Sequence, residues 1–162
     1  MNNNFYKKII IYISVLTLIF FLDRVSKIYI LQFASNNLDT NIYINQFLSL
    51  NLVWNKGVAF GLFSFEKSLI YNLITILIVI INLIILYLVF IYKDLRALFF
   101  LMILGGSLGN LFDRLYYGSV PDFIDINFRE FHWFIFNVSD IFISLGVLFL
   151  ISLELINNKK EK

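Results

Sequence analysis

Cysteine is absent from the 162 residues, and histidine and proline occur once each. Without cysteine the chain has no disulfide, no thiolate metal site, no cysteine nucleophile and no cysteine of its own to carry a lipid. A single histidine, His132, leaves too few groups for a histidine-based zinc site or a Ser-His-Asp triad. Because His132 lies in the aromatic run 131–136, we interpret it as a packing residue at a membrane interface.

Charged residues are also scarce, at 15% of the chain with a net charge of +2. The sequence has no basic stripe with interleaved aromatic residues, so we expect no nucleic-acid partner. Hydrophobic residues make up 60% of the chain, and the mean hydropathy is +0.82. A soluble domain of this size has no need for so much apolar material, and the composition therefore indicates an integral membrane protein.

Apolar runs predict transmembrane helices at residues 9–33, 68–92, 97–117 and 137–156. Each run is close to the ~20 residues that a helix needs to cross the hydrocarbon layer. We do not interpret the first run as a cleaved signal peptide, because no small-residue cleavage site follows it and the helical pattern continues past Asp23. We therefore expect an all-α membrane protein, with residues 1–162 forming a single integral membrane domain.

Two further features lie outside the predicted helices. Residues 48–55 alternate between apolar and polar side chains, which predicts a half-buried strand, with residues 42–44 as its partner in a small sheet. Residues 118–136 are rich in aromatic side chains, and we expect an interfacial loop there.

Basic residues predict the orientation. In a path of four helices they fall on one side of the membrane: Lys7, Lys8, Lys93, Arg96, Lys159, Lys160 and Lys162. The positive-inside rule then places both termini in the cytoplasm, and the small sheet outside it. Asp122 and Asp140 would both lie near the outer face.

Three aspartates, Asp113, Asp122 and Asp140, lie in or beside sequence apolar enough for a bilayer, which makes them functional candidates. Two close carboxylates share one proton, and such a pair can hydrolyse an amide. The ionised group takes a proton from water, and the protonated group donates to the carbonyl oxygen. We expect Asp122 and Asp140 to form this pair, although the helix face that carries Asn110 and Asp113 leaves Asp113 as an alternative to Asp122.

Other interpretations of these charges remain open. Asp140 follows Asn137 by three residues, so it could simply stabilise a helix start, and Asp122 could be an ordinary loop residue. Asp23 and Lys27 lie four apart on one helix face, either as an ion pair or with Lys27 facing a lipid headgroup or a substrate carbonyl. In a non-enzymatic transporter or scaffold, the charges would line an ion path or join helices.

Five segments, in order along nearly the whole chain, resemble the bacterial lipoprotein signal peptidase family, also called signal peptidase II. They are Asp23 with Lys27, residues 55–60 (Asn-Lys-Gly-Val-Ala-Phe), residues 105–114 (Gly-Gly-Ser-Leu-Gly-Asn-Leu-Phe-Asp-Arg), residues 120–123 (Val-Pro-Asp-Phe) and residues 136–140 (Phe-Asn-Val-Ser-Asp). Two positions depart from the family pattern: Ser139 stands where alanine is usual, and Pro121 where a branched apolar residue is usual. The Gly-x-Gly-Asp tetrapeptide of presenilin-type proteases does not occur.

The resemblance implies an aspartic endopeptidase that removes the signal peptide from prolipoproteins, cutting just before a cysteine that carries diacylglyceryl. It implies that Asp122 and Asp140 are catalytic. It also implies a set of residues that bind substrate or support the site: Asn55, Gly57, Asn110, Asp113, Arg114, Asn137, Asp23 and Lys27. The family works in the bacterial cytoplasmic membrane without metal or cofactor, in contact with membrane lipid, and the cyclic peptide antibiotic globomycin inhibits it.

Overall fold

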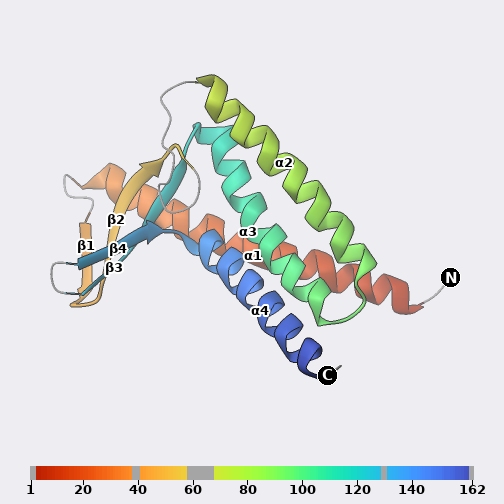
Figure 1. Cartoon of the computed structure of the whole chain (residues 1–162). Coiled ribbons are helices and arrows are strands. Elements are labelled where there is room, and N and C mark those ends of the chain that lie inside the picture. Colours follow the sequence, from red (N-terminus) through yellow and green to blue (C-terminus); the bar gives the residue numbers. More distant parts are fainter. Residues whose placement is uncertain (1–2, 38–40, 58–67, 129–130, 161–162) are drawn as a thin grey trace.

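The computed structural model describes residues 3–37, 41–57, 68–128 and 131–160. Long helices run away from a small sheet at one end of the molecule (Figure 1). Along the chain the elements are α1 (Asn3–Asn36), β1 (Asn41–Asn45), β2 (Leu48–Asn55), α2 (Ser68–Ile91), α3 (Leu95–Tyr117), β3 (Val120–Phe128), β4 (Phe131–Phe136) and α4 (Val138–Lys160). The predicted fold class, four membrane-length helices with a small sheet, is confirmed.

All four helices are long and apolar enough to cross a membrane. Their large apolar side chains are mostly exposed, for example Ile10, Leu83 and Leu148, and the buried apolar core is small. In water such a surface would aggregate, whereas in a bilayer it is solvated by lipid chains. The protein is therefore a multi-pass membrane protein. The first helix is longer at both ends than the predicted 9–33.

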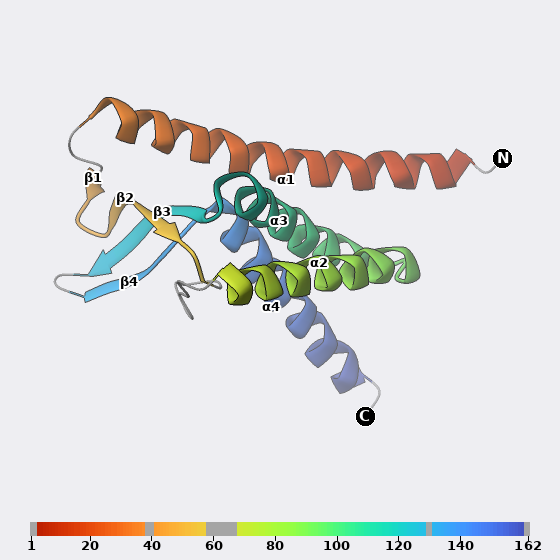
Figure 2. The ribbon, with the colours of Figure 1, turned by 90° about the horizontal axis from the view of Figure 1, so that it is seen from above.

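Helix α3 lies at the centre and contacts α1, α2 and α4 (Figures 1 and 2). Small residues on α3 allow two of these contacts to be close. A Cβ placed on Gly105 would lie 3.0–3.2 Å from the side chain of Ile19 on α1, and one on Gly106 would collide with the carbonyl oxygen of Ser139 on α4. These two close contacts bring the polar face of α3, which carries Asn110 and Asp113, against α1 and α4.

The sheet is antiparallel, with strand order β1-β2-β3-β4. The predicted strand at 48–55 and its pairing with 42–44 are confirmed. We expected residues 118–136 as an interfacial loop, but within this range residues 120–128 form β3 and residues 131–136 form β4. Pro121 made a strand less apparent, but it lies before Ile124, where the pairing of β3 with β4 begins, so this part of β3 is a sheet edge on that side and proline is tolerated. A paired strand, and not a loop, therefore holds Asp122.

Candidate active site

Asp122 lies in β3 beside the end of β2, and its side chain is buried, with the residue only 3% exposed. Both carboxylate oxygens accept hydrogen bonds from side-chain amides. Oδ1 accepts from Asn137 Nδ2 at 2.5 Å, and Oδ2 accepts from Asn55 Nδ2 at 2.8 Å. Burial, followed by the negative charge of nearby Asp140, raises the pKa of Asp122 to about 7, against the opposing effect of the two amides.

Asp140 lies in the first turn of α4 and is 5% exposed. Its Oδ2 accepts the backbone N–H of Asn137 at 3.2 Å, while the Asn137 side-chain oxygen accepts the backbone N–H of Asp140 at 3.1 Å. This reciprocal pair is a capping box, so the predicted helix-start role of Asp140 is present. Its Oδ1 faces the other way and accepts from Asn110 Nδ2 at 2.8 Å.

Asn137 joins the two aspartates. Its side-chain amide binds Asp122 and its backbone N–H binds Asp140, and the residue is fully buried. One asparagine therefore binds a carboxylate from β3 and a carboxylate from α4. The structure brings together the two aspartates that the sequence paired, with Asn55, Asn110 and Asn137 as their direct partners.

A group of four charged side chains lies behind Asp140, and we call it the buried tetrad: Asp23, Arg24, Lys27 and Asp113. Lys27 Nζ is 2.8 Å from Asp23 Oδ1 and 2.6 Å from Asp113 Oδ2. Lys27 is 0% exposed, so the structure shows the ion-pair interpretation, and the ammonium group contacts carboxylates and not lipid. The structure places Asp113 with these cations, not beside Asp140.

The buried tetrad is connected to Asp140 by two routes. Lys27 Nζ donates to Asn110 Oδ1 at 3.0 Å, and the amide nitrogen of Asn110 in turn donates to Asp140. The backbone N–H of Ser139, at the start of α4, donates to Asp23 Oδ1 at 3.1 Å. The charges on α1 and α3 therefore position both the side chain that binds Asp140 and the helix that carries it.

Arg114 supports the other aspartate. Its Nη2 donates to the carbonyl oxygen of Gly57, the backbone N–H of Gly57 donates to Asn55 Oδ1 at 2.8 Å, and Asn55 binds Asp122. Within the described ranges Arg114 forms no ion pair. The side chain of His132 lies outside the described residues, so its predicted packing role is not addressed.

Sequence reasoning missed two residues of this region. Arg24 completes the buried tetrad, and two cations in one membrane helix were a signal that two anions must face them. Tyr71 on α2 donates its hydroxyl to the backbone oxygen of Arg114 at 3.0 Å, and the Arg114 guanidinium lies 5.6 Å from the centre of its ring. No pattern in the sequence indicated Tyr71.

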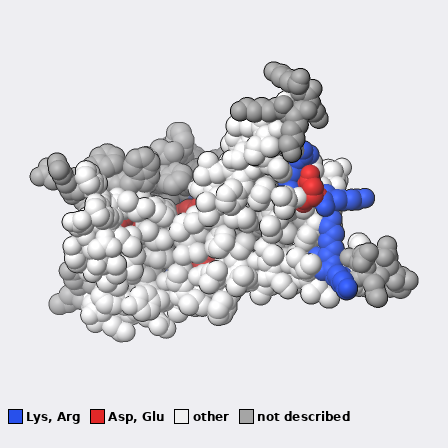
Figure 3. All heavy atoms as spheres, turned by 90° about the horizontal axis from the view of Figure 1, so that it is seen from below, with Lys and Arg blue, Asp and Glu red and all other residues white. Residues whose placement is uncertain are grey.

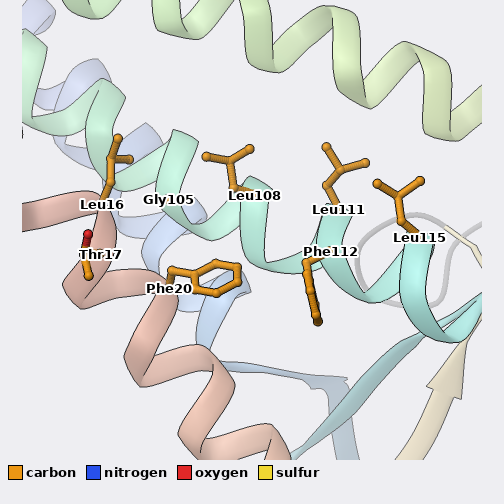
Figure 4. A pocket seen from close by; sticks show the side chains of 8 residues that line it. All are labelled: Leu16, Thr17, Phe20, Gly105, Leu108, Leu111, Phe112 and Leu115. Atoms are coloured by element: carbon orange, nitrogen blue, oxygen red, sulfur yellow. The ribbon is translucent and has the colours of Figure 1, made fainter. Parts of the chain in front are cut away.

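Asp140 borders two apolar grooves. One, of about 470 Å³, lies between α4 and the sheet and is lined by Ile126, Phe136, Ile141, Ser144, Leu145 and Leu148. The other, of about 270 Å³, lies among α2, α3 and α4 and includes Asn110 and Arg114. A third groove, between α1 and α3, includes neither Asp122 nor Asp140 (Figure 4). Asp140 is thus adjacent to surfaces that suit apolar chains.

The residues that the structure describes contain no cluster of histidine, cysteine, aspartate or glutamate suited to a metal ion. The chemistry available from the described side chains is that of two coupled carboxylates in a buried setting. Such a pair can hold a water molecule, remove a proton from it and protonate an acceptor oxygen.

Known proteins of one family match this chain along nearly its whole length. The family profile described as "Signal peptidase (SPase) II" matches residues 15–156. The lipoprotein signal peptidase of Pelagibacter ubique (strain HTCC1062) is 49% identical over 158 residues, covering 98% of this chain and 93% of the relative. That of Aquifex aeolicus (strain VF5) is 37% identical, covering 93% and 89%.

Solved structures show the same arrangement. A bacterial membrane enzyme determined by the in meso method at 2.3 Å resolution superposes with a TM-score of 0.73 and 27% identity, covering 93% of this chain and 91% of that one. A second, at 1.9 Å resolution, gives a TM-score of 0.70 and 27% identity, with 89% and 92% covered.

Proposed function

The chain belongs to the signal peptidase II family, and we propose that it is an aspartic endopeptidase that removes the signal peptide from diacylglyceryl-modified prolipoproteins. In this proposal it cuts just before the lipidated cysteine of the substrate. The observation that carries the proposal is the pair of buried aspartates, Asp122 and Asp140, held together by Asn137.

In the mechanism that we propose, Asp140 is ionised and Asp122 carries the shared proton. The start of α4 favours a negative charge on Asp140, and the Asn110 amide that binds it is itself bound to the Lys27 cation. Asp122 accepts its hydrogen bonds from the neutral amides of Asn55 and Asn137, and its pKa of about 7 allows it to hold a proton at neutral pH.

The reaction then follows in two steps. Asp140 takes a proton from water as the water oxygen attacks the scissile carbonyl carbon, and Asp122 donates its proton to the carbonyl oxygen. Collapse of the tetrahedral intermediate breaks the C–N bond, the proton held by Asp140 passes to the leaving amine, and the hydroxyl proton returns to Asp122. The pair ends with the one proton with which it began.

The substrate suits the setting of the pair. Its acyl chains stay in the outer leaflet and its signal peptide crosses the bilayer, so the scissile bond lies near the interface. Lys and Arg side chains gather at the end of the molecule far from the sheet (Figure 3), which by the positive-inside rule is the cytoplasmic end. We propose that both termini are cytoplasmic, that the active site is toward the outer face, and that globomycin competes with substrate there.

A gel-shift cleavage assay in detergent, with a diacylglyceryl-modified prolipoprotein, tests the proposal. We expect Asp122→Asn and Asp140→Asn each to lose about 10²- to 10⁴-fold or more in rate, the range for loss of a general acid or base. Asp113→Asn should keep measurable activity. Asp94→Asn is a matched control, since Asp94 is exposed at the start of α3.

Three outcomes would contradict the proposal or a part of it. Cleavage that survives in Asp122→Asn and is abolished in Asp113→Asn would make Asp113 the partner of Asp140. A parent protein and an Asp94→Asn control that both fold but never cleave would favour the non-enzymatic transporter or scaffold. Unmodified prolipoprotein serves as the substrate control, and equal cleavage of it would refute the requirement for the diacylglyceryl group.

A further inference from the structure

Arg24 is a charged side chain within a membrane-spanning helix, and it bridges two helices. Its Nη2 lies 2.6 Å from Asp23 Oδ2 on α1, and its Nη1 lies 2.6 Å from Asp113 Oδ1 on α3. The side chain is only 12% exposed. Because a guanidinium is a rigid planar fork, one arginine can hold two carboxylates at a defined separation in a way that lysine cannot.

The charges of the buried tetrad balance only when Arg24 is counted. Asp23 and Asp113 are both fully buried, and Lys27 contacts both of them. Lys27 alone would leave one negative charge uncompensated in a region that water does not reach, which is costly. With Arg24 the tetrad holds two cations against two anions.

Aromatic rings enclose the guanidinium. Its Cζ lies 5.6 Å from the ring centre of Phe20 on α1 and 4.8 Å from that of Phe112 on α3. The two rings meet edge to face, 5.8 Å apart, and both line the apolar groove between α1 and α3 (Figure 4). These contacts add cation–π attraction and hold Arg24 at the junction of the two helices.

Both partners of Arg24 lead to Asp140. Asp23 accepts the backbone N–H of Ser139, one residue before Asp140. Asp113 holds Lys27, which donates to Asn110, which donates to Asp140. A shift of either carboxylate would therefore move the start of α4 or the Asn110 amide.

We propose that Arg24 is a positioning residue for peptide cleavage, which neutralises the buried acid pair Asp23 and Asp113 and so fixes the charge and geometry behind Asp140. This inference rests on the proposed function. The charged groups that act directly on Asp122 and Asp140 are Lys27 and Asp23 of the tetrad, besides the two aspartates themselves. Arg114 on α3 reaches Asp122 only through Gly57 and Asn55, and α2 contributes the hydroxyl of Tyr71 to the backbone of Arg114. Of the two cations in the tetrad, Arg24 is the one that takes no part in either route to Asp140, so its loss unbalances the tetrad while the donors and acceptors of both routes remain.

The test compares kcat, KM and the pH profile of cleavage for the parent, Arg24→Gln, Arg24→Lys and the double variant Arg24→Gln with Asp113→Asn. We expect Arg24→Gln to lower kcat about tenfold to a hundredfold with little change in KM, as misplaced catalytic groups do. Its pH profile should move upward by about half a unit or more, because an uncompensated negative charge disfavours ionisation of the nearby carboxylates.

The double variant restores charge balance, with Asp23 facing Lys27, and its pH profile should return toward that of the parent. Arg24→Lys keeps the charge and should keep the parent profile, although kcat falls because the fork is lost. Arg96→Gln is a matched control, since Arg96 is a partly exposed ion-paired arginine at the other end of α3.

An Arg24→Gln protein with the kcat and pH profile of the parent would overturn the inference. So would equal losses of kcat in the single and double variants with no change in either profile, because that pattern is what lost packing produces. If Arg24→Gln does not fold, a shifted profile in Arg24→Lys overturns the inference and an unshifted one supports it. Failure of the proposed function looks different, since the parent and Arg96→Gln would then not cleave at all.

Discussion

Replacing Asn137 with alanine removes a side chain that binds both aspartates of the proposed active site. The amide bond to Asp122 Oδ1, at 2.5 Å, is lost, and so is the acceptor for the backbone N–H of Asp140. The backbone N–H of Asn137 still binds Asp140, because alanine keeps it. The change therefore loosens Asp122 most and Asp140 less.

The magnitude follows from the two lost bonds. Asp122 becomes a carboxylate as it donates its proton in the transition state, and a hydrogen bond to a charged group contributes about 1.5–3 kcal/mol. A helix N-cap contributes about 1 kcal/mol. If the transition state needs both, the barrier rises by about 2.5–4 kcal/mol, which lowers kcat by about 10²- to 10³-fold. The pKa of Asp122 should also rise above about 7, because the Asn137 amide lowers it in the parent.

The assay is cleavage of the lipidated prolipoprotein in detergent, with kcat, KM and thermal unfolding measured on the same preparation. Asn72→Ala is the matched control, because Asn72 is an exposed asparagine on α2. A folded Asn137→Ala protein that cleaves within about twofold of the parent rate would refute the reasoning, since the calculated barrier increase would then be absent.

Two further predictions concern pH and packing. Cleavage should decline as pH rises through about 7, because Asp122 then loses its proton. The pKa of Asp122 in the folded protein lies above its ordinary value of 3.8. The contribution of Asp122 to folding stability is therefore full below pH 3.8 and is lost as pH rises to about 7. Thermal unfolding of Asp122→Asn between pH 4 and 8 should lack this loss, and equal pH slopes for parent and variant would contradict it. Gly106→Ala should cost about 1–3 kcal/mol of unfolding free energy and reduce cleavage, because a Cβ there collides with the backbone of α4. Gly118→Ala is the control, because a Cβ there meets nothing within 4 Å and only the φ of 71° is unfavourable, at about 1–2 kcal/mol. A larger loss of unfolding free energy in Gly118→Ala than in Gly106→Ala would argue against the close contact of α3 with α4.

Periodicity and spacing predicted the local features of the fold. The alternation in residues 48–55 identified β2. The four-residue spacing of Asp23 and Lys27 placed them on one helix face and gave an ion pair as one of two interpretations, and the structure shows that pair. The same reasoning missed β3 and β4, because Pro121 and the run of aromatic residues suggested an interfacial loop. The β2–β3 pairing that holds Asp122 joins residues far apart in the sequence, and no local pattern reports it.

The site was predictable in its residue types and not in its contacts. Spacing left Asp113 and Asp122 as alternative partners for Asp140, since both lie in suitable sequence. In the structure Asn137 joins Asp122 to Asp140, while Asp113 faces the cations of the buried tetrad. Arg24 escaped sequence reasoning because its partner on α3 becomes visible only when the helices pack.

The sequence by itself determined that this is a membrane protein with four spanning helices, because transfer into a bilayer depends on the composition and length of each segment. Tertiary structure alone decided which charges meet. The contacts of α3 with α1 and α4, and the pairing of β2 with β3, bring together carboxylates, amides and cations from distant segments. A hydrogen bond requires its atoms to lie within about 3 Å, and only the packed chain sets distances of that size between such segments.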